Sequence, residues 1–133
     1  MIFIDKNNPR AWSSLGYIYK ENAQIDRAVA AYEKAFSLKP QDKGVCFDLG
    51  MAYCLKHEFA KAVPCFERIR NLGPDKGKPL AVNILNYHYN ALDMLKVCYQ
   101  KSGDIAKEEE IEREIKKYYS KTSEGAGRIN LYE

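Results

Sequence analysis

The chain has 133 residues, of which 46% are apolar and 29% are charged, which is enough to bury one small, elongated core. Its 21 basic and 18 acidic residues are intermixed and leave a formal net charge of +3, so we expect neither a nucleic-acid partner nor an anionic membrane surface. The apolar run at the start ends at Ile4 and is too short for a signal peptide or a membrane anchor.

Residues 1–8 have the pattern of a helix end followed by a linker. They occupy the same positions of the 34-residue repeat as the residues from Ala35 to Asp42, and their pattern is similar. Two interpretations stay open. The strip is the end of a preceding repeat, in which case the chain is a fragment of a longer protein, or it is an N-terminal cap that lies against Trp12.

Residues 9–42 are predicted to form two helices. Apolar residues at three- and four-residue spacing define a first helical face and, after the polar interruption at 22–24, a second one. These residues are Ala11, Leu15, Ile18 and Tyr19, then Ile25, Ala28, Val29, Tyr32, Ala35 and Leu38. Gly16 and Ala28 are small where two antiparallel helices would cross, and Pro40 follows the second helix, which it cannot continue.

Residues 43–76 repeat this unit. Eight residues of the first unit recur unchanged 34 positions later. The first unit carries the motifs Trp12-x2-Leu15-Gly16-x2-Tyr19, Ala28-x3-Tyr32 and Pro40. The second unit carries Leu49-Gly50-x2-Tyr53, Ala62-x3-Phe66 and Pro74 at the same spacing. The spacing and the residue types resemble the tetratricopeptide repeat, a helix–turn–helix unit that stacks into a superhelix. The resemblance implies an all-α, right-handed superhelical stack of antiparallel helix pairs that serves as a scaffold for other proteins.

Residues 77–120 are interpreted as a third, divergent repeat. Leu95, Tyr99 and Gly103 align with the first two units only if about twelve residues are inserted after Pro74. The apolar period predicts one long helix from about Pro79 to Gln100 and a last helix from about Ile105 to Ser120.

This third unit departs from the repeat pattern at two positions. Lys96 and Glu108 stand where small residues are expected, so we expect its helices to pack less closely. Its charged last helix suits a solenoid cap.

Residues 121–133 contain Gly125 and Gly127 and are predicted to be a flexible tail. The other interpretation is that Ile129, Leu131 and Tyr132 occupy a groove of this chain or of a neighbour.

No catalytic, cofactor or metal site is expected. The sequence has no glycine-rich phosphate loop, nucleophile elbow or His-Glu metal motif. Its cysteines lie in predicted helices without CxxC spacing, which favours a reducing, cytoplasmic compartment. These are Cys46, Cys54, Cys65 and Cys98. His57 in a turn and His88 on an apolar helix face are each interpreted as packing or surface residues rather than ligands.

The resemblance also implies a concave groove lined by one face of each first helix. Carried onto this chain, its lining is Arg10, Ser13, Tyr17 and Lys20, then Gly44, Phe47, Met51 and Cys54, and in the third unit Asn90, Asp93, Val97 and Gln100. We expect the apolar members to form an exposed strip that binds a peptide or helix of a partner. The other interpretation is that the chain's own last helices or tail cover the strip.

The sequence bears on four further possible functions. Self-association into a homodimer and a docking or regulatory role within a larger repeat protein both stay open. The lysine–asparagine clamp by which some family members hold the carboxylate of chaperone C-termini is absent, and Asp48 would repel a carboxylate. An RNA-binding relative of the repeat is disfavoured because no basic stripe is present.

Overall fold

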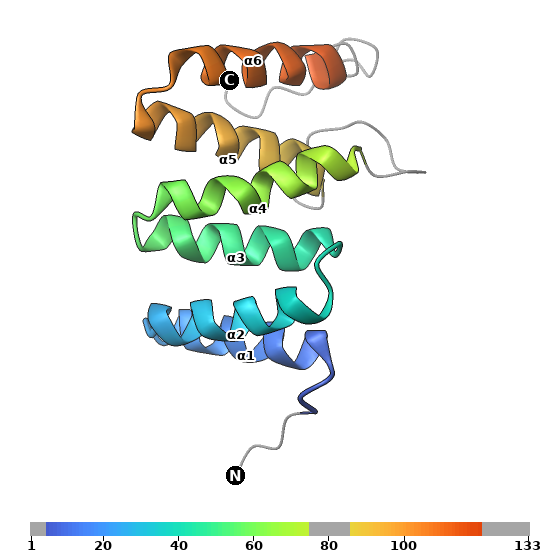
Figure 1. Ribbon diagram of the computed structural model, residues 1–133, viewed down its shortest axis with the longest axis vertical. Coiled ribbons are helices and arrows are strands. Elements are labelled where there is room, and N and C mark those ends of the chain that lie inside the picture. Colours follow the sequence, from blue (N-terminus) through green and yellow to red (C-terminus); the bar gives the residue numbers. More distant parts are fainter. Residues whose placement is uncertain (1–4, 75–85, 121–133) are drawn as a thin grey trace, which may run out of the picture.

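The computed structural model describes residues 5–74 and 86–120, and in these ranges the chain is helical without strands (Figure 1). The helices are α1 (Pro9–Glu21), α2 (Ile25–Leu38), α3 (Lys43–Leu55), α4 (Phe59–Leu72), α5 (Tyr87–Ser102) and α6 (Ile105–Ile115), followed by a π-helical turn, η1 (Lys116–Ser120). Figure 1 shows them stacked in chain order along the long axis of the molecule. The predicted all-α stack of antiparallel helix pairs is confirmed.

One backbone turn closes all three helix pairs. Ala23, His57 and Gly103 occupy the same place in the three units and have φ values of 60°, 59° and 75°. The next residue in each unit donates its N–H to a tyrosine carbonyl, at 2.8 Å from Gln24 to Tyr19, 2.9 Å from Glu58 to Tyr53 and 2.9 Å from Asp104 to Tyr99. Of these three residues, only Gly103 can adopt the left-handed conformation without backbone strain, because it has no Cβ atom. The third unit therefore keeps the turn of the regular repeats although its helices have diverged.

An aromatic ring packs on a glycine in each of the first two helix pairs. A Cβ atom on Gly16 would lie 2.7 Å from the ring of Tyr32, and a Cβ atom on Gly50 would lie 2.7 Å from the ring of Phe66. Both rings are almost completely buried. The missing side chain therefore permits the close crossing of α1 with α2 and of α3 with α4, whereas the sequence pattern alone suggested a contact with Ala28.

The third helix pair replaces this contact by charged and polar bridges. Lys96 and Glu112 stand at the positions of the glycine and the ring, and Lys96 Nζ lies 3.6 Å from Glu112 Oε1. Gln100 Nε2 donates to Glu108 Oε1 at 2.9 Å. Long polar side chains thus join α5 to α6 where the regular units have a ring against bare backbone.

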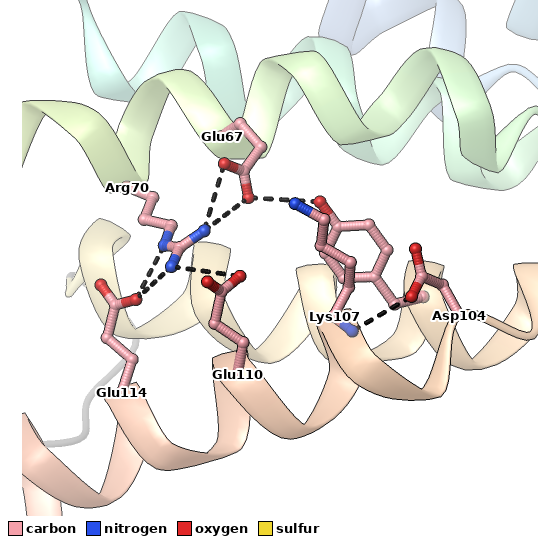
Figure 2. A network of polar contacts seen from close by, with 7 residues as sticks. Glu67, Arg70, Asp104, Lys107, Glu110 and Glu114 are labelled. Carbon is pink, nitrogen blue, oxygen red and sulfur yellow. Dashed lines mark hydrogen bonds and ion pairs between the residues drawn. The ribbon is translucent and has the colours of Figure 1, made fainter.

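Arg70 of α4 ties the third unit to the second (Figure 2). Its guanidinium donates to Glu114 at 2.7 Å and to Glu67 at 3.2 and 3.3 Å, and lies 3.7 Å from Glu110. The Tyr99 hydroxyl of α5 also donates to Glu67, at 3.4 Å. Because Glu110 and Glu114 belong to α6, one half-buried side chain connects α4 to α6 across α5.

The first helix of the third unit begins later than predicted. Asn86 is its N-cap, with φ −87° and ψ 89°, and its side chain accepts the N–H of Tyr89 at 2.9 Å. This conformation is not helical, so α5 begins after Asn86, and the predicted continuous helix from Pro79 to Gln100 is wrong at this residue. The predicted segment before it, like the residues 1–4 and the predicted tail at 121–133, lies outside the described residues. At 16 residues α5 is nevertheless the longest described helix.

The core runs continuously from the second unit into the third. Cys46 is completely buried in it. His88 is 1% exposed, and its Nδ1 lies 2.6 Å from the Tyr119 hydroxyl of η1. One apolar residue expected on the inner face of α1 differs, because Ile18 is 49% exposed.

We predict that Gly50→Ala destabilises the fold although alanine is the better helix former. Helix propensity alone would stabilise the variant by about 1 kcal/mol. The added carbon at 2.7 Å from Phe66 requires the ring to shift, and such overpacking costs about 1–3 kcal/mol. The measurement is urea unfolding of both proteins, followed by circular dichroism.

Phe66→Leu and Gly50→Ala/Phe66→Leu are the matched control pair, since without the ring the added carbon should cost less stability than it does in the wild type. Equal or higher stability of Gly50→Ala would contradict the ring-on-glycine contact.

Candidate peptide-binding groove

Two neighbouring pockets lie between the first helices of the two regular repeats. The first has a volume of about 220 Å³ and is called the Ser13 pocket; it is lined by Pro9, Arg10, Ser13, Lys39, Asp42, Gly44, Val45 and Asp48. The second has a volume of about 440 Å³ and is called the Met51 pocket; it is lined by Lys20, Glu21, Tyr32, Phe47, Asp48, Met51 and Leu55. Asp48 belongs to both, so the two pockets form one groove along α1 and α3.

Side-chain caps set the start of both helices that flank the groove. The Asn8 side chain accepts the N–H groups of Arg10 and Ala11 at 2.9 and 3.3 Å, and the Asp42 side chain accepts that of Val45 at 3.1 Å. Asn8 and Asp42 are equivalent positions of the two repeats. Because α1 and α3 begin in the same register, their equivalent faces lie side by side.

Most groove positions predicted in the first two units lie at these pockets. Arg10, Ser13, Lys20, Phe47 and Met51 all line one of them. Tyr17 lines neither pocket. It is 54% exposed and adjoins the Met51 pocket through Lys20, whose Nζ lies 4.9 Å from the centre of the Tyr17 ring. Leu55, which the sequence pattern did not single out, lines the Met51 pocket and is 52% exposed. Its position one turn after Met51 is the signal that would have identified it.

Phe47 is not the free groove residue that was expected. Its ring packs edge-on against Phe66 with centroids 5.7 Å apart, and against Tyr87 with centroids 5.9 Å apart. The expectation that Phe47 belongs to an exposed strip is therefore wrong for most of its ring. Only part of its side chain faces the groove, because the rest joins α3 to α4 and α5.

The groove positions predicted in the third unit do not line these two pockets. Val97 is half-buried and Asp93 is exposed, while Gln100 is bonded to Glu108. Cys54, predicted at the end of the second unit's groove face, instead has its Sγ 4.0 Å from Cys98 Sγ of α5. That contact lowers the pKa of the Cys54 thiol, and burial opposes the change. Cys54 thus contacts the third unit rather than lining either pocket.

Asp48 is the half-buried carboxylate shared by the two pockets of the groove. Burial raises the pKa of its carboxyl to about 6; Lys20 acts to lower this pKa and Asp42 acts to raise it. Within the described residues no hydrogen bond or ion pair reaches the carboxylate. A charged group that is partly desolvated and lacks a partner reduces the stability of the fold. Sequence reasoning treated Asp48 only as a residue that repels a carboxylate.

Ser13 is the second polar group without a partner. Its Oγ atom is buried and has no hydrogen-bond partner among the described residues. Ser13 and Asp48 line the same pocket, so an unpaired carboxylate and the residue that carries the unpaired, buried hydroxyl lie at a common space. The carboxylate can accept hydrogen bonds from a donor that enters the groove, and the hydroxyl can do so once the Ser13 side chain rotates toward that donor.

A third pocket lies at the open end of the stack. It has a volume of about 410 Å³ and is lined by Trp12, Leu15, Tyr19, Arg27, Ala30, Ala31 and Lys34 of α1 and α2. Trp12, Leu15 and Tyr19 belong to the repeat signature yet are only half-buried, because no helix covers them from this side in the described residues. This pocket is apolar at its centre and carries two cations.

Neither a membrane helix nor a metal cluster is seen in the part of the chain that the structure describes. None of its helices has the length and apolar character needed to cross a bilayer. The same residues contain no group of three or more His, Cys, Asp or Glu side chains arranged to hold a metal ion.

Comparison with known proteins supports the repeat fold. The family model of the tetratricopeptide repeat matches residues 9–42, which are the residues predicted for the first repeat. No curated protein matches the sequence.

Two solved structures of MamA share the fold. One is 20% identical to this chain, covers 92% of it and has a TM-score of 0.69. The other is also 20% identical, covers 96% and has a TM-score of 0.67. This chain spans 63% and 61% of their lengths, respectively, so the likeness concerns the fold. The family resemblance and the all-α repeat fold are thereby confirmed.

We predict that Asp48→Asn stabilises the protein at neutral pH. The folded-state pKa of about 6 lies above the unfolded value of about 3.9. The folded state therefore binds more protons between these values, and stability falls as the pH rises through them. At about pH 7.5 the variant should gain about 1 kcal/mol, a figure discounted for the partial exposure of the group.

The measurement is urea unfolding of the two proteins at several pH values. Below about pH 4 the difference should vanish, because the carboxyl is then protonated in both states. A variant that is less stable than the wild type at neutral pH would show that a partner already satisfies the carboxylate.

Proposed function

We propose that this tetratricopeptide-type chain is a non-enzymatic scaffold that binds a peptide or helix of a partner protein in the groove between α1 and α3. The observation that carries the proposal is the Met51 pocket. Exposed and half-buried apolar side chains gather there on a frame of packed helices. Solvent-exposed apolar surface of this kind is typical of interaction sites.

The frame supports binding because it is formed without the ligand. Tyr32 and Phe66 are buried beneath the groove against Gly16 and Gly50, so the helices that carry the groove residues are held by the core. A partner segment would then lose its own freedom while the scaffold loses little. Apolar side chains such as Met51 and Leu55 adapt to different occupants.

A cytoplasmic location fits this proposal and stays a prediction from the cysteine pattern. All four cysteines lie among the described residues, and each is a free thiol. Reducing compartments preserve such thiols.

We predict that peptides selected on the full chain from a random phage-displayed library bind in this groove. The double variant Tyr17→Ala/Leu55→Ala should weaken the selected peptides by about tenfold or more, because exposed apolar contacts of this size each contribute about 1 kcal/mol. Both side chains are more than half exposed, so the thermal stability should stay close to that of the wild type. Phe47 is left unchanged because it belongs to the core. Affinity is measured by fluorescence anisotropy.

Ile105→Ala is the matched control, since Ile105 is 66% exposed and lies on α6. It should leave the affinities unchanged. Peptides that bind the double variant as well as they bind the wild type, or a library that yields no binders, would refute the groove as the binding site.

Self-association is the second candidate function, and the open-end pocket is the observation that favours it. Its half-buried Trp12, Leu15 and Tyr19 offer an apolar surface that a second copy of the chain could cover. Covering apolar area is the main driving force for such association.

Light scattering across a hundredfold dilution tests this candidate. If the end pocket pairs two copies, a dimer should dissociate on Ala30→Glu, which places a charge in the pocket, and persist in Ala60→Glu on the exposed side of α4. Ala30 and Ala60 are both exposed. A monomer at all concentrations, or a dimer indifferent to Ala30→Glu, would exclude pairing through this surface.

A further inference from the structure

Asp48 and Ser13 have a role that an apolar groove alone does not explain. We infer that they form a subsite that selects a basic side chain, lysine or arginine, of the segment bound in the groove, while a nearby apolar residue of the same segment enters the Met51 pocket. This inference rests on the proposed function, because it names the chemistry of the partner that the groove takes.

The position of Asp48 is the first argument. It is the residue that the Ser13 pocket and the Met51 pocket share. Its carboxylate therefore borders both the polar and the apolar part of the groove. A ligand that lies along α3 has to pass it.

The lack of a partner for the carboxylate is the second argument. Lys20 influences Asp48 electrostatically, but the two side chains form no ion pair, and the Lys20 ammonium lies over the Tyr17 ring instead. Asp42 and Glu21 are acidic and cannot neutralise it. Asp42 is itself occupied by the N–H of Val45 and lies 3.9 Å from Lys39. A cationic group of a ligand would supply the ion-pair partner that the Asp48 carboxylate lacks in the fold.

The buried Ser13 hydroxyl is the third argument and is independent of the charge. Its Oγ atom is buried without a hydrogen-bond partner, on the opposite wall of the pocket from Asp48 because Ser13 belongs to α1. Ammonium and guanidinium groups carry several N–H donors and no acceptor. One such group can donate to the carboxylate, and also to the hydroxyl once the Ser13 side chain rotates toward the pocket.

An acidic ligand is the competing possibility, because Arg10, Lys20 and Lys39 also line the groove. Arg10 and Lys39 are exposed, and ion pairs made by solvated side chains contribute little. Asp48 is half-buried, so a hydrogen-bonded cation there gains more. An acidic side chain beside Asp48 would also meet like charge. The balance favours a basic ligand.

The spacing along α3 specifies the ligand further. Met51 and Leu55 follow Asp48 by three and seven residues, which is about 5 and 10 Å along a helix. An extended segment spans the shorter distance in about two residues, and a helical segment spans it in about one turn. The expected ligand therefore has a basic residue and an apolar residue two positions apart if extended, or three to four apart if helical.

The test uses the peptides selected on the full wild-type chain, resynthesised with both ends capped and without acidic residues or histidine. Each is compared with a version in which its basic residue is replaced by glutamine. We expect lysine or arginine to be enriched at one position, and Asp48→Asn to weaken the basic peptides by about tenfold while changing the glutamine versions less than about twofold. Ser13→Ala should weaken the basic peptides by a smaller factor. Glu109→Gln, an exposed carboxylate change on α6, should have no effect.

The pH dependence gives a second readout. Charged groups that line the groove around Asp48 are Arg10, Lys20 and Glu21 of α1 and Lys39 and Asp42 near the start of α3. Since the pKa of Asp48 is about 6, affinity for a basic peptide should fall as the pH is lowered from about 7.5 to about 5. The Asp48→Asn variant should lack this dependence.

The outcomes separate the inference from the proposed function. Peptides that depend on Tyr17 and Leu55 but show no basic preference, or an acidic one, overturn the Asp48 subsite and leave the groove standing. An equal loss for basic and glutamine peptides in Asp48→Asn also overturns it, because the residue then acts on the scaffold. Peptides that ignore Tyr17 and Leu55 overturn the proposed function itself.

Discussion

The contact of an aromatic ring with bare helical backbone is the constraint on which the rest of this structure depends. Tyr32 lies against Gly16 and Phe66 lies against Gly50, each in a space that a single added carbon would overfill. Van der Waals packing at this distance holds each helix pair in one geometry. Because the same contact occurs in both repeats, α1 and α3 present equivalent faces side by side, and the groove between them is a consequence of the core beneath it.

The third unit shows what happens when this contact is replaced. Lys96 and Glu112 bridge the two helices with long side chains, and Arg70 adds ion pairs that reach α6 from α4 (Figure 2). Such polar bridges depend on partners from separate helices and are weaker per contact than ring packing. The unit keeps the shared turn at Gly103, so α5 and α6 still form an antiparallel pair. The side-chain contacts between the two helices differ from those in the regular repeats. The charged last helix is consistent with the predicted cap.

The groove combines a rigid apolar floor with two unsatisfied polar groups. Phe47 contributes to both the floor and the core, which links the groove to the packing of α5 through Tyr87. The folded state would be more stable if Asp48 and Ser13 had hydrogen-bond partners within it. Their lack of partners distinguishes this part of the surface from an ordinary solvated helix face. Under the proposed function, stability and binding would place opposite demands on Asp48, a relation that is common where a site is formed before its ligand arrives.

Local spacing in the sequence determined the helix pairs, their turns and the register of the two regular repeats. Helical periodicity and small residues at crossings act within a few residues, so the pattern from Trp12 to Pro74 was sufficient to predict the fold. The resemblance to the repeat also predicted eight first-helix groove positions in these two units, of which six line the two pockets. The third unit's two polar substitutions were also visible in the sequence. The partners of Lys96 and Glu108 were not, because they come from the facing helix.

Only the tertiary structure decided which side chains each helix meets. Phe47 occupies a groove position by its spacing, yet Phe66 and Tyr87 draw its ring into the core. Helix α5 begins at Tyr87 because Asn86 caps it, although the apolar period continues further back. The unpartnered state of Asp48 and Ser13 depends on the packing of α1 against α3. The burial of a side chain and its polar partners depend on how several helices pack together. The spacing of residues along the sequence predicts the individual helices but not the contacts between them.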